Sequence, residues 1–242
     1  MAQLNEFDHP DFVPERKTSS IINHALAMYK GIALYGIIAM LIYITGSYII
    51  QNAIGFDSVK MLDEIRSNEG YYSEFNYGEI PGFSTFLTLS GIFVLLLSPL
   101  YTGLIFIAAK YNYRIKARFS DLFIGYHKNF IQIIIYSIIA GLLSGFAALF
   151  CFFPLLLVYP FLLSGYAVLL FEDASAIEAL KRSAALARQN YGTFLAVTIV
   201  GMLMSWSGVV LCGIGIVLTA PFFAVVTYSA YRAFSDKPVK IL

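Results

Sequence analysis

Six long apolar stretches contain no Asp, Glu, Lys, Arg or His, and this feature limits the fold more than any other. They cover residues 31–53, 83–109, 130–150, 154–171, 192–211 and 213–231. Each is close to the ~20 apolar residues that a helix needs to cross a ~30 Å hydrocarbon layer. The sequence therefore predicts an all-α integral membrane protein with six transmembrane helices.

The composition agrees with this prediction. The chain has 59% hydrophobic and 13% charged residues, whereas about a quarter of an ordinary soluble domain is charged. Its formal net charge of +1 argues against a role in nucleic-acid binding. Residues 1–20 lack a basic segment followed by an apolar core, so we expect the first span to act as an uncleaved anchor.

The basic residues predict the orientation, because short loops rich in Lys and Arg stay in the cytoplasm. Of the 16 basic residues, only Lys60 and Arg66 fall in the loops that this rule places outside. The other fourteen lie in the tails and alternate loops: Arg16, Lys17, Lys30, Lys110, Arg114, Lys116, Arg118, Lys128, Lys181, Arg182, Arg188, Arg232, Lys237 and Lys240. We therefore expect a multi-pass protein of the bacterial inner membrane with both termini cytoplasmic.

An offset of 61 positions aligns the second half of the chain with itself. It brings Asn129 onto Asn190, Ser144 onto Ser205, Cys151 onto Cys212, Pro160 onto Pro221 and Phe161 onto Phe222. Internal symmetry of this kind is common in membrane folds. We predict three hairpin repeats, each with a cytoplasmic interfacial amphipathic segment and a returning span kinked by Pro99, Pro160 or Pro221.

The predicted division of the chain follows these repeats. A cytoplasmic tail and interfacial segment occupies 1–30, and the first hairpin occupies 31–109 with an acidic outer loop at 54–82. The second and third hairpin repeats occupy 110–171 and 172–234, and residues 235–242 form the other tail.

Two segments are expected to lie in the headgroup region. In 174–190, Ile177, Leu180, Ala184 and Ala187 recur at helical spacing, and Asp173 or Ser175 could begin this helix. The 115–128 segment mixes basic and aromatic residues. The basic residues of the two segments serve either as positive-inside anchors or as a site for anionic lipid. They are Lys116, Arg118, Lys128, Lys181, Arg182 and Arg188.

The run Glu178-Ala179-Leu180-Lys181-Arg182-Ser183, with Asn190 after it and a span beginning at Pro154 before it, resembles a known group of families. These are uncharacterised bacterial polytopic membrane proteins related to the membrane domain of glycerophosphoryl diester phosphodiesterase. The stretch from Pro221 to Arg232 is similar to their closing helix, whereas Leu155 replaces the glycine that commonly follows their proline. The resemblance covers about residues 115–235, and it implies a polytopic fold without implying an activity.

Residues suited to catalysis are scarce. His9, His24 and His127 all lie at the edges of spans or in a tail, and we expect no metal, cofactor or catalytic site. Cys151 and Cys212 could form a disulfide or remain small buried apolar residues. The serines and threonines within the spans, Ser47, Ser90, Ser137 and Thr198 among them, are expected to bond their own helix or a neighbour.

Two further features point to contacts. Small residues form stripes on the third span (Gly141, Ser144, Gly145, Ala148) and the fifth (Gly201, Ser205, Gly208), and either packing between the repeats or a homo-oligomer would explain them. The outer loop carries six acids and two basic residues. Its aromatic residues either dock a protein partner or rest on the bundle: Tyr71, Tyr72, Phe75 and Tyr77.

These observations favour a non-enzymatic inner-membrane protein that acts through lipid or protein contacts, as a scaffold, an assembly partner or in envelope maintenance. The alternative is a carrier or channel for a lipidic or weakly polar solute. A continuous path of Ser, Thr and Tyr through the bundle would favour that alternative.

Overall fold

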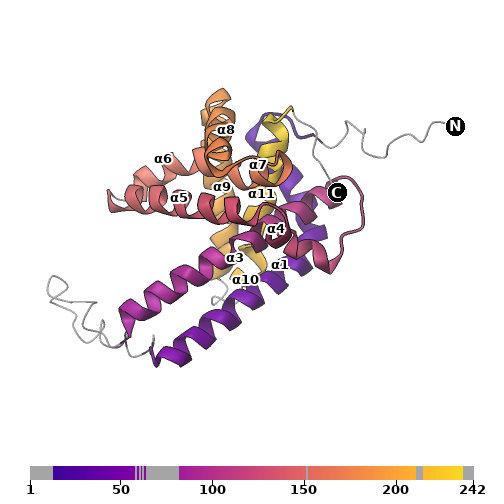
Figure 1. The fold of residues 1–242 in the computed structure, drawn as a ribbon. Helices are drawn as coiled ribbons and strands as arrows, with labels where there is room; N and C mark the ends of the chain where they lie inside the picture. Colours follow the sequence, from indigo (N-terminus) through magenta and orange to yellow (C-terminus); the bar gives the residue numbers. More distant parts are fainter. Residues whose placement is uncertain are drawn as a thin grey trace. The chain divides into compact units, whose positions relative to one another are not determined.

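A computed structural model describes residues 13–57, 59, 61, 63, 82–150, 152–210 and 215–236. The chain forms two compact units: Met1–Met40 with Ser98–Leu242, and Leu41–Leu97. Helices account for every element in the described ranges (Figure 1). The predicted outer-loop contacts Tyr71, Tyr72, Phe75 and Tyr77 lie outside these ranges, as do Cys151 and Cys212.

Six helices are long and apolar enough to span a membrane, which confirms the predicted number. They are Thr18–Ile54, Phe83–Asn112, Phe130–Leu149, Phe153–Phe171, Tyr191–Val210 and Ile216–Phe234. The first two are the single helices α1 (Thr18–Ile54) and α3 (Phe83–Asn112). The remaining elements are η3 (Phe119–Phe123), α4 (Ile124–His127), α5 (Phe130–Leu149), α6 (Phe152–Leu162), α7 (Gly165–Phe171), α8 (Ala176–Gln189), α9 (Tyr191–Trp206), η4 (Ser207–Val210), α10 (Ile216–Thr219) and α11 (Phe222–Phe234).

The α1 helix begins earlier than the sequence predicted. The predicted tail and interfacial segment ended at residue 30, but α1 starts at Thr18 and continues without a break into the span. Ile21, Ala25, Met28 and Ile32 are buried at intervals of three or four residues, which is one face of a helix. The same face therefore packs inside the larger unit on both sides of residue 30.

Prolines mark the points at which two of the spans are interrupted. Pro160 lies two residues before the end of α6, and Pro221 is the N-cap of α11 just after α10. Pro99 differs, because α3 continues through it. Proline has no N–H to donate to the preceding turn, so carbonyl groups near it need another partner in an apolar medium.

Tyrosine hydroxyls supply partners for carbonyl groups near these interruptions. The Tyr136 hydroxyl donates to the Leu162 carbonyl at 2.7 Å, and Tyr191 donates to the Leu157 carbonyl at 2.8 Å. Tyr29 donates in the same way to a carbonyl in α10. Each of these bonds links a tyrosine of one helix to the backbone of another.

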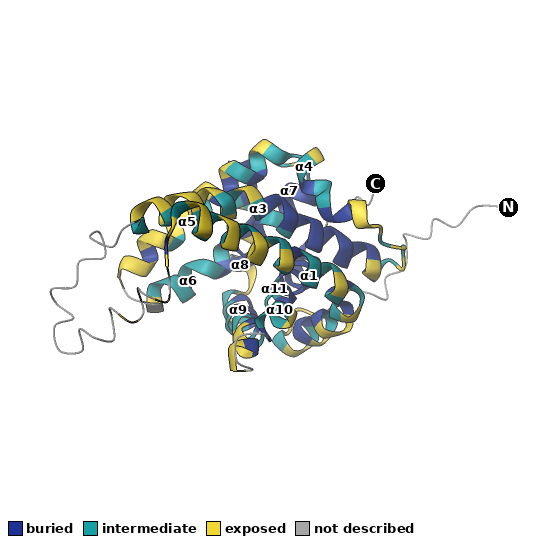
Figure 2. Cartoon of the chain, turned by 90° about the horizontal axis from the view of Figure 1, so that it is seen from below, coloured by how far each residue is buried: buried dark blue, intermediate teal, exposed yellow. Residues whose placement is uncertain are grey.

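The core of the larger unit lies around α7 and α11. Ala167–Phe171 are all buried in α7, whereas only four residues of α5 are buried, and Figure 2 shows this difference as a dark-blue α7 and a largely yellow α5. The α5 helix packs on α6, α6 packs on α8 and α9, and α9 packs on α11.

The 115–128 segment folds as a loop followed by η3 and α4. The η3 helix lies so close to α3 that a side chain on Gly103 would collide with the Leu122 backbone.

The smaller unit, Leu41–Leu97, contains the C-terminal part of α1 and the N-terminal part of α3. Any side chain at Gly46 would overlap the Phe93 ring, so glycine permits the close approach of the two helices. The Phe56 ring stacks on Phe86 with centroids 4.5 Å apart, beside Gly55, which has a φ of 71° and ends α1. Only glycine adopts that conformation without strain.

Candidate functional site

The structure describes all six basic residues that the sequence proposed for anionic lipid. Four are exposed: Lys116, Arg118, Lys181 and Arg188. The other two are partly buried and form ion pairs. Lys128 Nζ lies 3.2 Å from an Asp173 oxygen, and Arg182 Nε lies 3.7 Å from a Glu172 oxygen.

These two ion pairs hold the connection between α7 and α8. The side chain of Glu172 is only 5% exposed, and its carboxylate also accepts a hydrogen bond from the Tyr231 hydroxyl at 3.2 Å. Burying a carboxylate without a partner costs free energy, and the ion pair with Arg182 offsets this cost. Lys128 and Arg182 therefore have structural partners, and the four exposed cations remain available for a headgroup.

The beginning of α8 is fixed by hydrogen bonds. The Asn129 side chain donates to the carbonyls of Leu169 and Ala174 at 3.1 and 2.9 Å. Ser175, one of the two residues predicted to begin this helix, is its N-cap. It forms a reciprocal pair of hydrogen bonds with Glu178. The Ser175 backbone N–H, followed by its hydroxyl, lowers the pKa of Glu178.

The buried face of α8 agrees with the predicted one only in part. Ala187 is buried as predicted, whereas Ile177, which the sequence placed on the apolar face, is 58% exposed. The other buried residues of α8 are Ala176, Ala179, Ser183 and Leu186. Lys181 and Arg188 lie on the exposed side, seven residues and so about two turns apart. Together with Ile177, they give α8 an outward surface that is basic and partly apolar.

A buried ion pair connects α3 to η3. Lys110 Nζ lies 2.8 Å from Asp121 Oδ1, and the two side chains are 10% and 11% exposed. The other Asp121 oxygen accepts the Arg118 backbone N–H at 2.6 Å. This pair fixes the direction in which the chain leaves α3, and it directs the Arg118 backbone inward while its side chain stays exposed.

His24 takes part in a hydrogen-bonded chain that has the order of a catalytic triad. Its Nδ1 lies 2.8 Å from Ser229 Oγ, and its Nε2 lies 3.1 Å from Asn112 Oδ1. Such an order can activate a serine. Here Ser229 is 0% exposed and Asn112 is 1% exposed. The hydrogen-bonded chain joins α1, α3 and α11 in the interior of the larger unit.

Each of the two units has a cavity that is lined by described residues. The first, of about 710 Å³, lies in the larger unit. Its lining comes from α6, α9, α10 and α11 and is mostly apolar, with Leu155, Tyr159, Met202, Trp206, Ile216 and Phe223 among its residues. Ser205 also lines it, and its buried hydroxyl has no hydrogen-bond partner among the described residues.

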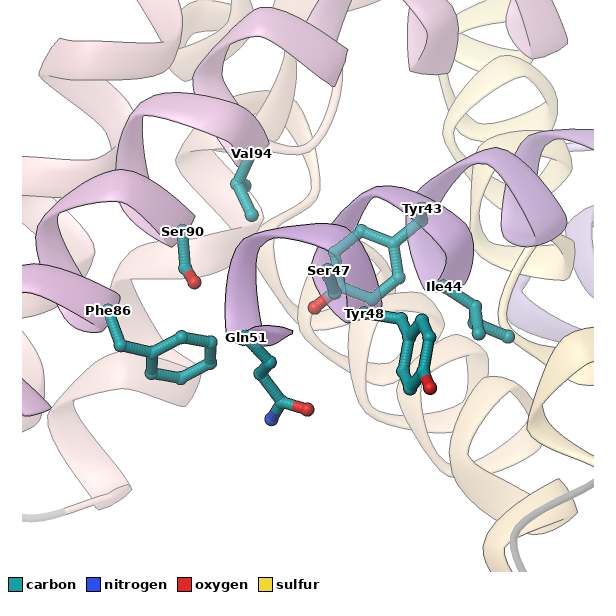
Figure 3. A pocket seen from close by; sticks show the side chains of 8 residues that line it. All are labelled: Tyr43, Ile44, Ser47, Tyr48, Gln51, Phe86, Ser90 and Val94. Atoms are coloured by element: carbon teal, nitrogen blue, oxygen red, sulfur yellow. The ribbon is translucent and has the colours of Figure 1, made fainter. Parts of the chain in front are cut away.

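The second cavity, of about 490 Å³, lies within the smaller unit between α1 and α3 (Figure 3). Tyr43, Ser47 and Gln51 contribute from α1, and Phe86 and Ser90 contribute from α3. The sequence assigned Ser47 and Ser90 to bonds within or between helices and missed this cavity. The spacing of 43, 47 and 51 was the available signal, because residues four apart share a helix face.

Three histidines, cysteines or acids that could share a metal ion are not found together anywhere in the part of the chain that the structure describes. Comparison of the chain with models of protein families, with curated protein sequences and with solved structures finds no match.

Proposed function

We propose that this protein acts without catalysis by binding a membrane lipid, whose acyl chain occupies the apolar cavity of the larger unit. The single observation that carries this proposal is the cavity of about 710 Å³ between spans of high hydropathy. We also propose that the protein lies in the inner membrane with both termini cytoplasmic and that it contains hairpin repeats. Through its lipid contacts it would serve as a scaffold or in envelope maintenance.

The lining determines which occupant fits. Water needs several polar partners to occupy a cavity, and this lining offers few. An empty cavity would forfeit the dispersion contacts of its walls. The surroundings of a membrane span are hydrocarbon, so an acyl chain is the apolar group available to fill it.

The exposed cations extend the proposal to the headgroup. Lys181 and Arg188 share one side of α8, whereas Lys128 and Arg182 are already paired with acids. An exposed cation near a membrane surface contributes about 1 kcal/mol to the attraction of anionic lipids. We therefore propose a preference for anionic lipid through Lys116, Arg118, Lys181 and Arg188. A protein partner at the outer loop and a homo-oligomer remain predictions.

The hydroxyl groups within the larger unit favour this function over a carrier or channel. Tyr101 bonds Thr227 at 2.8 Å, and Ser137 bonds Tyr166 at 3.0 Å. Thr227 and Ser137 are 1% and 7% exposed. Hydroxyls bonded to one another in a packed region stabilise the bundle, whereas a solute path needs hydroxyls that face a passage.

The chain carries its own reporter for the test, because its single tryptophan, Trp206, lines the cavity. We expect lipid with brominated acyl chains, added in small amounts to protein in mild detergent, to quench Trp206 fluorescence saturably. Ala220→Phe, which fills the cavity, should abolish the saturable part, and Ala148→Phe on an exposed face should not. Quenching that rises linearly, or that Ala220→Phe leaves unchanged, would refute lipid binding here.

A further inference from the structure

The cavity between α1 and α3 in the smaller unit differs in chemistry from the apolar cavity. None of its eight described lining residues is charged. Figure 3 shows the polar ends of Ser47, Gln51 and Ser90 at the space between the two helices, with the Phe86 ring beside them. The cavity thus combines hydroxyl and amide groups with aromatic walls.

Ser90 has an unused hydroxyl at this cavity. A serine or threonine inside a helix usually bonds the carbonyl four residues earlier, as Thr88 does with Ser84 at 2.8 Å. The Ser90 Oγ is buried and has no partner among the described residues. A polar group in this state costs free energy until a ligand bonds it.

The absence of charge among these lining residues restricts the ligand. A charged headgroup would lose hydration without gaining a counter-ion, which is strongly unfavourable. Hydroxyl and amide groups such as those of Ser90 and Gln51 can both donate and accept. They match a group that also does both, and the flanking rings match its attached hydrocarbon.

We propose that this cavity binds a neutral lipid whose headgroup carries a free hydroxyl, such as a diacylglycerol. The site lies within Leu41–Leu97 and its lining is confined to that unit. It is separate from the acyl-chain cavity of the proposed function, and it selects for the opposite headgroup chemistry.

The test uses the full-length protein in mild detergent with a tryptophan placed at this cavity. Trp206→Phe removes the native reporter, and Ile44→Trp adds one among the lining residues. We expect saturable quenching by a brominated diacylglycerol and at least tenfold weaker quenching by a brominated phosphatidylglycerol. Equal quenching by both lipids, or none that saturates, would overturn the proposal.

Ser90→Ala and its control Ser84→Ala separate binding from folding. Ser90→Ala should weaken diacylglycerol binding about threefold to tenfold, which corresponds to one hydrogen bond. It should leave the unfolding midpoint of the lipid-free protein unchanged or slightly higher, because it removes an unbonded hydroxyl. Ser84→Ala, on an exposed position outside the lining, should change neither. A lowered midpoint with unchanged binding in Ser90→Ala would identify a structural role and reject the site.

The two proposals can fail independently. The Trp206 experiment reports on the larger unit, and the Ile44→Trp experiment reports on the smaller one. Loss of quenching in one with persistence in the other would therefore identify which cavity binds no lipid.

Discussion

The α5 and α9 helices begin 61 positions apart in the sequence, and both carry small residues, yet they use them differently. In α9, Gly201 is buried against Val226 and Phe223 of α11. In α5, Gly141 and Gly145 are exposed, and a side chain at either would meet no described atom within 4 Å. Gly201 therefore packs on a helix of its own predicted repeat, whereas Gly141 and Gly145 of α5 pack on no described residue. Small residues permit a close approach, but the neighbouring helix decides whether it occurs.

The asparagines before these helices also differ. Asn190 caps α9 by accepting the Thr193 N–H at 3.4 Å. Asn129 has a φ of 59°, a left-handed conformation, and donates to two carbonyls of the α7–α8 region. The repeat was predicted from sequence positions alone, and the two equivalent asparagines make different contacts.

The largest expected effect compares glycines of the two helices. Gly201→Ile should lower the free energy of unfolding by about 2 to 3 kcal/mol, because the side chain would overlap Val226, whose Cγ1 lies 2.9 Å from the position of an added Cβ. Gly141→Ile should change it by less than about 0.5 kcal/mol. Denaturant titration in mild detergent measures both. Equal destabilisation would mean that α5 packs its glycines as tightly as α9 does.

The asparagine pair should show the next largest difference. Asn129→Ala removes two hydrogen bonds of ~1 kcal/mol each and leaves alanine at a positive φ, so we expect a loss of about 2 kcal/mol or more. Asn190→Ala removes one long capping bond and should cost about 1 kcal/mol or less. The same titration applies, with Asn129→Gly as a control that keeps the backbone conformation accessible. A larger loss of unfolding free energy in Asn190→Ala than in Asn129→Ala would contradict this prediction.

Ser137 and Thr198 are 61 positions apart, as Asn129 and Asn190 are. Ser137 bonds the Ile133 carbonyl and the Tyr166 hydroxyl, whereas Thr198 is fully buried without a partner among the described residues. Ser137→Ala should therefore cost about 1 kcal/mol. Thr198→Val keeps the shape and removes an unbonded hydroxyl, so thermal unfolding should show no loss or a slight gain. A clear loss in Thr198→Val would reveal a partner of its hydroxyl.

The smallest effect concerns acid, and it tests the start of α8. Glu178 accepts hydrogen bonds from Ser175, and these lower the pKa of its carboxyl group in the folded protein. A lowered folded pKa adds stability above the unfolded value of 4.5, and this stability disappears as pH falls through the folded value. Unfolding measured across this acidic range should therefore depend less on pH in Glu178→Gln than in the native protein. Identical curves for the two proteins would show that the carboxylate adds no stability to α8.

The candidate sites were only partly accessible from the sequence. Counting cations named Lys128 and Arg182 as candidates for either positive-inside anchors or lipid contacts. Their pairing with Asp173 and Glu172 depends on how α5 and α8 approach the end of α7. The cavity at Ser90 was missed because a serine in a span usually bonds its own helix, and only the placement of α1 beside α3 within the smaller unit leaves this hydroxyl unbonded.

The sequence by itself determined that six helices are long and apolar enough to span a membrane, because burying ionisable groups in hydrocarbon is costly and the six stretches contain none. It could not determine where α1 starts, since residues 18–30 are compatible with either a helix or an interfacial segment. Only the tertiary structure decided which glycines are packed, which hydroxyls find partners and which cations are neutralised. Those outcomes depend on contacts between helices that are distant in the chain, and hydropathy along a single helix contains no information about its neighbour.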